Sequence, residues 1–374
     1  MKIKFNNLYQ EHNLIKKNLE KKFKKLFKST DFINGTEVKI FEENLKKITK
    51  SKYAVSCGNG TDALQISLMS LDLKQNDEVI IPAFSYISII ETTVLLGLKP
   101  ILVDVNYDTF NIDEKKIESK ITNKTKVIVP VHLFGQNCNM NIIKRIAKKY
   151  KLFIIEDSAQ SISTNYYYYS KKIQSGAIGD LGCFSFFPTK NMGCYGDGGA
   201  IITNNHKLYK KIKMIKNHGQ KFKYQHDLVG VNSRLDTIQA CVLNSKLKIL
   251  KKNNLARKFN ASIYHKILKN EKNIVLPLKL NHSDHTYHQF TIKVKNNKRD
   301  FLKNELDKNG IPSIIYYPYP MHYHRAYKKF FKKDKNFKIS EKLSLEVLSL
   351  PIHPYLKKKE IEYVSNKIID ILNE

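Results

Sequence analysis

Short apolar runs alternate with stretches of helical periodicity between residues 53 and 203. Each run is three to five residues long, and helical segments such as residues 141–150 lie between several of them. This alternation is typical of a parallel sheet covered by helices. The sequence therefore predicts an α/β fold class, with strands near residues 53–56, 78–81, 99–103, 127–131, 153–155 and 200–203.

The pattern changes after about residue 250. A long lysine-rich helix is predicted over residues 240–265, then strands near residues 287–294, a helix near residues 299–309 and a last helix from residue 358. A chain of 374 residues is long enough for two domains with buried cores. We therefore predict a large domain over residues 1–250, with an N-terminal helix, and a small α+β domain over residues 251–374.

The chain carries 65 Lys and Arg residues against 34 Asp and Glu, a net charge of +31. Such a charge can serve binding to nucleic acid or to an anionic membrane, because displaced counterions favour association. Here the basic residues are nearly all lysine and are spread from end to end of the chain, as an AT-rich coding bias would produce. We therefore predict no nucleic-acid partner, although the positive field would attract an anionic substrate.

Targeting and metal-binding patterns are not evident. The N-terminus is polar, and no run approaches the roughly 18 to 20 apolar residues that cross a bilayer. The five cysteines form no CxxC pair, which speaks against a zinc site and a disulfide framework. We therefore predict a cytoplasmic protein with reduced cysteines, no metal and no membrane partner.

Two side chains follow strand-like runs in a way that suits carbonyl chemistry. Asp157 ends one apolar run, and Lys190 follows another and precedes a glycine-rich turn. Ligands of open α/β sheets bind at the carboxyl ends of the strands. There a carboxylate can pair with a protonated ring nitrogen, and a lysine can capture a carbonyl. This pair predicts a site for pyridoxal 5'-phosphate (PLP).

A phosphate site is predicted in the turn at residues 58–63, Gly-Asn-Gly-Thr-Asp-Ala, which opens a helix. Its backbone amides, a hydroxyl and the helix dipole all favour an anion. Many strand-to-helix turns share this composition, so the turn alone is weak evidence for a phosphate site. Together with Asp157 and Lys190 it is much stronger evidence.

Several motifs in order resemble the DegT/DnrJ/EryC1/StrS family of PLP-dependent sugar-nucleotide aminotransferases. The resemblance implies a fold-type I aminotransferase with a mostly parallel seven-stranded sheet in its large domain and a small C-terminal α+β domain. It also implies PLP as cofactor and a homodimer with active sites at the interface. The matching segments are residues 59–64, 77–86, 131–135, 156–160, 185–200, 230–236 and 350–353.

The resemblance also implies roles for individual residues. Lys190 matches the lysine that attaches PLP and later carries a proton between substrate and cofactor, and Asp157 matches the partner of the ring nitrogen. Tyr86 matches the aromatic residue that stacks on the ring, and Gln160 matches the contact to the ring hydroxyl. The implied phosphate site consists of Gly60, Thr61, Asp62 and Ser185, completed by Asn232 from the other subunit.

The lysine segment bears on which sugar carbon is aminated. Residues 186–199 resemble the branch that acts on 3-keto sugars, whereas enzymes for 4-keto sugars usually carry a histidine-containing loop that ends in Gly-Glu-Gly-Gly. Other segments are most similar to enzymes that act on UDP-2-acetamido-2-deoxy-3-oxo-D-glucuronate. Arg234 suits a sugar carboxylate, although deoxysugar 3-aminotransferases keep this arginine too. Tyr316 and Tyr317 stand where His-Tyr is expected, so a substrate-contacting histidine is absent.

The predicted function is transfer of an amino group from L-glutamate to C3 of a 3-keto nucleotide sugar, in the biosynthesis of surface polysaccharide such as O-antigen or of glycan precursors. A dTDP-3-oxo-6-deoxyhexose is the alternative substrate. A 4-keto sugar and a non-catalytic anion-binding scaffold are further alternatives, and related dehydratases carry histidine in place of Lys190.

Some positions have structural interpretations as well. Arg234 could form a salt bridge at an interface, Asn232 could cap the helix that begins near residue 234, and His132 is predicted to be structural. The tyrosine run at residues 166–169 is predicted to form part of a hairpin and to cover the surface.

Overall fold

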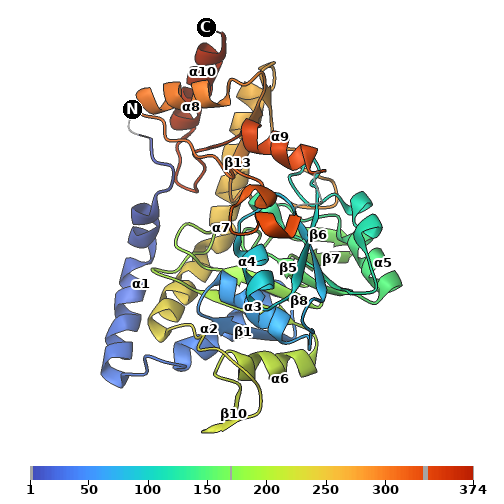
Figure 1. Ribbon diagram of the computed structural model, residues 1–374. Helices are drawn as coiled ribbons and strands as arrows, with labels where there is room; N and C mark the ends of the chain where they lie inside the picture. The colour runs from blue at the N-terminus through green and yellow to red at the C-terminus, as the bar shows by residue number, and fades with distance from the viewer. Residues whose placement is uncertain (1–2, 169–170, 332–335, 374) are drawn as a thin grey trace.

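A seven-stranded sheet forms the centre of the larger part of the molecule in this computed structural model, which describes residues 3–168, 171–331 and 336–373 (Figure 1). The strand order is β1-β9-β8-β5-β4-β2-β3. In this sheet β9 runs antiparallel to β1 and β8 and the other pairs are parallel, which confirms the predicted mostly parallel sheet. The strands are β1 (Tyr53–Cys57), β2 (Glu78–Pro82), β3 (Lys99–Val103), β4 (Thr125–Ile128), β5 (Phe153–Asp157), β8 (Leu181–Ser185) and β9 (Gly199–Thr203).

A proline shortens one predicted strand. Residues 127–131 were expected to form it, but β4 ends at Ile128. The Val129 amide still donates to the Ile80 carbonyl at 2.8 Å, and the ladder then stops because Pro130 has no amide hydrogen. Val131 instead forms a single bridge to Asp157, beside the end of β5.

Helices cover both faces of the sheet, because successive strand residues point to opposite sides. In β2, Val79 and Ile81 join one hydrophobic cluster and Ile80 joins another. Helix α5 (Met140–Tyr150) buries Ile143 and Ile146 against the second cluster, and its lysines lie outside it. The other helices of this part are α1 (Leu8–Ser29), α2 (Thr36–Thr49), α3 (Gly60–Met69), α4 (Ser88–Leu95), α6 (His206–Ile215) and α7 (Thr237–Leu268).

The C-terminal part has its own hydrophobic cluster, built on a three-stranded antiparallel sheet. Helix α7 joins the two parts, because Ala240 and Leu243 pack in a cluster of the larger part and Tyr264 and Leu268 pack in the C-terminal one. The predicted boundary at residue 250 therefore falls inside one continuous helix, and it stays a prediction. The elements are β12 (Ile274–Val275), β13 (Phe290–Val294), β14 (Val347–Leu350), α8 (Arg299–Lys308), α9 (Lys338–Glu346) and α10 (Lys358–Asn373).

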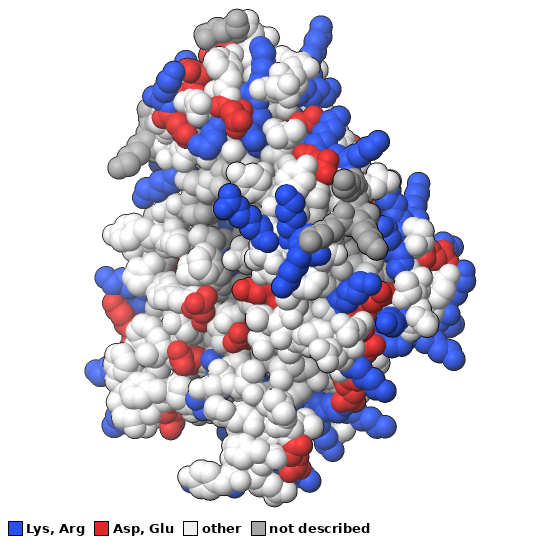
Figure 2. Space-filling view, viewed as in Figure 1, with Lys and Arg blue, Asp and Glu red and all other residues white. Residues whose placement is uncertain are grey.

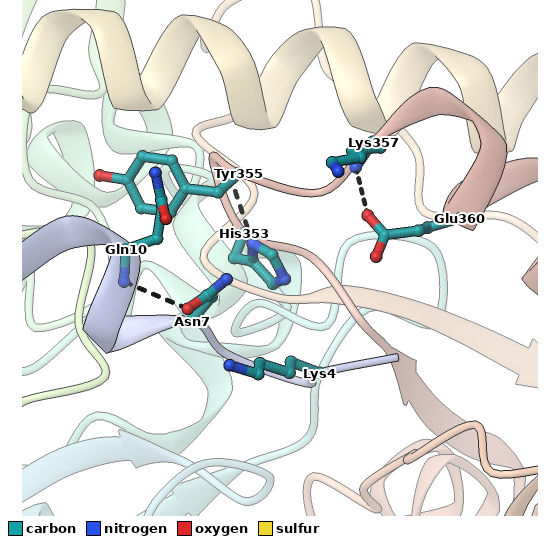
Figure 3. Close-up of a pocket in the computed structure, with 7 residues that line it drawn as sticks. All are labelled: Lys4, Asn7, Gln10, His353, Tyr355, Lys357 and Glu360. Atoms are coloured by element: carbon teal, nitrogen blue, oxygen red, sulfur yellow. Dashed lines mark hydrogen bonds between the residues drawn. The ribbon is translucent and has the colours of Figure 1, made fainter. Parts of the chain in front are cut away.

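The N-terminal segment connects both parts (Figure 1). Helix α1 packs along α7, and Glu11 forms a buried ion pair with Lys246 at 2.6 Å. Ahead of α1 the chain meets the turn after β14, where a cavity of about 510 Å³ opens (Figure 3). Its lining contains no residue predicted for the site and consists of Lys4, Asn7, Gln10, His353, Tyr355, Lys357 and Glu360.

The tyrosine run corrects one prediction. It does lie in a hairpin, formed by β6 (Asn165–Tyr168) and β7 (Lys171–Gln174), but it does not simply cover the surface. Strand alternation turns Tyr166 inward, where it is fully buried and its hydroxyl accepts a hydrogen bond from the Asn141 amide at 3.0 Å. Tyr167 points outward and is 40% exposed, and Tyr169 lies outside the described residues.

Basic side chains do not gather into one patch on the face drawn in Figure 2. Lys and Arg lie over its upper part and along its right side, interspersed with acidic residues. Among the described helices, none is both long and apolar enough to cross a bilayer.

A buried carboxylate anchors the end of β5. Glu156 accepts hydrogen bonds from the backbone amides of Gly176, Ile178 and Gly179 at 3.0, 2.6 and 2.6 Å. It also accepts one from His132 Nε2 at 2.8 Å, because His132 Nδ1 accepts the Cys138 amide and the ring hydrogen is left on Nε2. Glu156 therefore stabilises the strand end that positions Asp157.

Replacing Glu156 with alanine should lower the free energy of unfolding by about 3 kcal/mol or more, because buried donors would lose their partner. Urea unfolding measures the change. Glu20→Ala is the control, because Glu20 is 62% exposed and its ion pair with Lys16 is long, at 3.9 Å. This substitution should lower the free energy of unfolding by less than about 0.5 kcal/mol. Equal effects in the two variants would contradict the anchoring role of Glu156.

Candidate active site

One edge of the seven-stranded sheet carries the predicted site. Strands β1, β2, β5 and β8 end at this edge, and β9, which runs the other way, begins there. The segments that leave these strands enclose a cavity of about 600 Å³ together with residues of the C-terminal part. The cavity brings together the predicted residues Gly60, Thr61, Asp62, Tyr86, Asp157, Gln160, Ser185, Lys190, Tyr316 and Tyr317.

Asp157 is a buried carboxylate that has no ion-pair partner among the described residues. It is 7% exposed, and its Oδ1 accepts a hydrogen bond from the Ala159 amide at 3.1 Å. Burial raises the pKa of the Asp157 carboxyl, while the hydrogen bond from the Ala159 amide and the positive charge of Lys190 oppose the rise. No Lys, Arg or His of the described chain forms an ion pair with it, so a cationic group on a ligand would find an uncompensated charge here.

Lys190 lies in the turn that follows β8, where its amide donates to the Phe187 carbonyl at 2.9 Å. Burial lowers the pKa of its amine to about 8, although the negative charge of Asp157 opposes this effect. Its Nζ has no hydrogen bond to any described group. A larger fraction of the amine is therefore neutral near neutral pH than in an exposed lysine, and the neutral amine is the nucleophile.

The N-terminus of α3 and the last residue of β8 form the predicted phosphate cup, which we define as Gly60, Thr61, Asp62 and Ser185. Within the described chain, the amides of Gly60 and Thr61 donate to no other group, whereas the Asp62 amide donates to Asn59 Oδ1 at 2.8 Å. The turn lies directly against β8, because a Cβ on Gly60 would sit 2.6 Å from Ser185 Cβ. Free amides, two hydroxyls and a helix N-terminus thus meet at one point, which favours an anion.

Aromatic side chains form another part of the cavity wall. Gln160 joins these aromatic residues to the turn after β4, because its Oε1 accepts from the Phe134 amide at 2.7 Å and its Nε2 donates to the Tyr317 hydroxyl at 3.2 Å. The ring of Tyr86, which is 56% exposed, lies 6.2 Å from the ring of Tyr317, and the ring of Tyr316 lies 5.6 Å from that of Tyr317. Burial raises the pKa of the Tyr316 hydroxyl, so this wall is uncharged at neutral pH.

Two predicted residues do not line this cavity. Asn232 is exposed and pairs with Asn217 through an isolated bridge, and Arg234 is partly buried nearby. Asn232 does not cap α7, because that helix begins at Thr237 and its N-cap residue is Asp236. That Asn232 and Arg234 serve the active site of another subunit therefore stays a prediction.

The structure adds His288 and Asp197 to the cavity lining, which sequence reasoning missed. His288 precedes β13 in the distant C-terminal part, and its Nδ1 lies 3.2 Å from Asn191 Oδ1, next to Lys190 in the chain. Burial, with the charges of Lys190 and Arg257, holds the pKa of His288 well below its usual range, so its ring is neutral. Nothing local in the sequence marks this residue, because its place depends on packing between the two parts.

The residues of this cavity fit PLP. The free amides and hydroxyls of the cup suit its phosphate, the uncompensated Asp157 carboxylate suits a protonated ring nitrogen, and the unbonded Lys190 amine suits its aldehyde. The three features lie in one cavity of about 600 Å³.

Comparisons with known proteins agree with this chemistry. A model of the DegT/DnrJ/EryC1/StrS aminotransferase family matches residues 13–369. The UDP-2-acetamido-2-deoxy-3-oxo-D-glucuronate aminotransferase of Pseudomonas aeruginosa is 38% identical over 97% of this chain and 98% of its own length. The dTDP-3-amino-3,6-dideoxy-alpha-D-galactopyranose transaminase of Aneurinibacillus thermoaerophilus is 39% identical over 97% of both chains. The solved structure of NtdA from Bacillus subtilis with bound cofactor PMP superposes with a TM-score of 0.92 at 32% identity, covering 100% of this chain and 86% of that one.

Lys190 should titrate with a pKa of about 8 in the protein without PLP, whereas an unstructured lysine peptide titrates near roughly 10.4. In Asp157→Asn the pKa should fall further, because the charge that favours the ammonium is lost. Competitive acetylation with trace acetic anhydride across pH, followed by mass spectrometry of the Lys190 peptide, measures both values. A pKa that rises in Asp157→Asn would contradict the pairing of these two groups.

Proposed function

Since this chain belongs to the DegT/DnrJ/EryC1/StrS aminotransferase family and is a PLP-dependent sugar aminotransferase, we propose that it moves an amino group from L-glutamate to C3 of a 3-keto nucleotide sugar. The observation that carries the proposal is the unbonded Lys190 amine in one cavity with the buried Asp157 carboxylate and the phosphate cup. Amination at C3 is supported by the two relatives above, whose names describe a 3-oxo sugar and a 3-amino sugar.

The residues of the cavity divide the work. PLP, when bound, supplies an electron sink that stabilises negative charge on the carbon from which a proton is removed. Asp157 would pair with the ring nitrogen and keep it protonated, because the Asp157 carboxylate has no ion-pair partner among the described residues. Lys190 would carry the proton at the reacting carbon, since its pKa of about 8 in the protein without PLP is close enough to neutral pH for the amine both to accept and to donate a proton. Tyr86 and Gln160 would orient the ring.

The cavity of a single protomer is incomplete for these ligands. Its lining has three carboxylates, of Asp62, Asp157 and Asp197, and one ammonium group, of Lys190. PLP and a nucleotide sugar both bring phosphate charge, so further cationic or donor groups are required. We infer that a second copy of this chain supplies them, with Asn232 completing the phosphate cup and Arg234 facing the sugar carboxylate, in a homodimer with shared active sites.

Exposed apolar side chains on the same segment support that homodimer. The hairpin of β10 (Gln220–Phe222) and β11 (Gln225–His226) and the chain beyond it carry Phe222, Tyr224 and Val229, which are 64, 82 and 87% exposed. Large apolar groups at such exposure mark interaction surfaces when they lie together. Burying these apolar side chains against a second copy of the chain would bring Asn232 and Arg234 close to that copy.

The preferred substrate is UDP-2-acetamido-2-deoxy-3-oxo-D-glucuronate, and a dTDP-3-oxo-6-deoxyhexose is the second candidate. Arg234 can pair with the C6 carboxylate of the first, and the second lacks this group. We propose that the product is a precursor of surface polysaccharide such as O-antigen and that the reaction takes place in the cytoplasm.

A panel of UDP- and dTDP-linked 3-keto and 4-keto sugars, incubated with protein, PLP and glutamate, tests the substrate. We expect an amine at C3, identified by mass spectrometry and NMR, and none in Lys190→Ala. Arg234→Met should raise KM for the carboxylate sugar roughly tenfold or more and leave that of the methyl sugar nearly unchanged, because only the former loses a charge pair. Amination at C4 alone would overturn the proposal.

Hybrid dimers test whether the active sites are shared. Lys190→Ala and Asn232→Asp subunits with different tags are coexpressed, and dimers that carry both tags are isolated. If Asn232 serves the other subunit, one of the two sites in each hybrid is wild type, and activity should be about half that of the wild-type dimer. If Asn232 serves its own subunit, both sites carry a substitution and the hybrids should be as inactive as the parents.

A further inference from the structure

Ser233 lies between Asn232 and Arg234, yet its side chain contacts the turn that carries the phosphate cup. Ser233 is 2% exposed, and its Oγ accepts a hydrogen bond from the Gly58 amide at 2.9 Å. The same hydroxyl donates to Asp62 Oδ2 at 2.6 Å. One buried hydroxyl therefore holds both the first residue of the turn and a carboxylate of the cup.

The segment that carries Ser233 is itself held firmly. The Ser233 amide donates to the Lys216 carbonyl at 2.9 Å, and the Val231 amide donates to the Ile215 carbonyl at 2.8 Å. Lys216 Nζ in turn donates to the Ser56 carbonyl of β1 at 2.7 Å. Ser233 is thus a fixed point against which the turn after β1 is positioned.

Asp62 needs such a restraint because its negative charge lies in the cup that is proposed to bind a phosphate. Its carboxylate belongs to the first turn of α3, beside the amides of Gly60 and Thr61 that would meet a phosphate. A mobile carboxylate there would repel the phosphate and could accept from those same amides. Packing agrees with a fixed orientation, since a Cβ on Gly58 would lie 2.8 Å from Asp62 Oδ2.

We propose that Ser233 is a positioning residue for the phosphate group of PLP. Its hydroxyl holds the Asp62 carboxylate against Gly58, so that the amides of Gly60 and Thr61 stay available to the anion. The inference rests on the proposed phosphate cup. It gives the segment of Asn232 and Arg234 a second task, because the same stretch of chain orders the cup of its own subunit.

Binding of PLP and of pyridoxal, which lacks the phosphate, separates this role from a general structural one. Both dissociation constants are measured by absorbance titration of protein freed of cofactor. In Ser233→Ala we expect PLP to bind about tenfold more weakly, with pyridoxal changed less than about twofold. Ser344→Ala is the control, because the hydroxyl of this buried serine donates to the Glu341 carbonyl within α9 and has no other hydrogen bond to a described residue. It should leave both constants unchanged.

The double variant Ser233→Ala/Asp62→Ala tests the mechanism. If Ser233 acts by restraining the Asp62 carboxylate, adding Ser233→Ala to Asp62→Ala should weaken PLP binding less than about twofold, a non-additive result. An additive loss, an equal loss for pyridoxal or no loss in Ser233→Ala would overturn the inference. If the wild-type protein binds PLP no better than pyridoxal, the phosphate cup itself is wrong, a failure distinct from that of Ser233.

Discussion

The site depends on a buried negative charge that the described part of the chain does not neutralise. Asp157 lies at the end of β5, where a carboxylate of the neighbouring Glu156 is fully satisfied and Asp157 itself has one backbone donor. The contrast separates their tasks, because Glu156 fixes the strand end and Asp157 remains available to a cation. The charges of Lys190 and Asp157 interact, but the two side chains form no direct ion pair. Both groups therefore stay available to a ligand.

The net charge of the chain says little about this site. The protein carries +31, yet three carboxylates and a single ammonium group line the cavity. Anionic ligands therefore depend on local features of the site. These are the free amides at the start of α3, the Asp62 carboxylate that Ser233 restrains, and donors that a second subunit would bring. The segment of residues 231–234 connects these features. Ser233 contacts the phosphate cup of its own subunit, and Asn232 and Arg234 are proposed to reach the active site of the other subunit.

Asp157, Lys190 and the turn at residues 58–63 could be predicted because each lies within a few residues of the end of an apolar run, and the ends of neighbouring strands converge at one sheet edge. His288 could not, because a residue of the C-terminal part reaches the cavity only through packing of the two parts. Tyr166 shows the same limit, since a run of identical side chains does not reveal which one a hairpin turns inward. Ser233 could not be distinguished from its neighbours, because its partners lie more than 170 residues away in the chain.

The central claim is that one lysine among many binds the cofactor, and it can be tested directly. The protein is incubated with PLP, reduced with borohydride and digested, and mass spectrometry locates the pyridoxyl group. The account predicts that the group is found on Lys190 in stoichiometric amount and is lost in Lys190→Ala. A pyridoxyl group on another lysine, or one distributed over the surface lysines, would contradict the account.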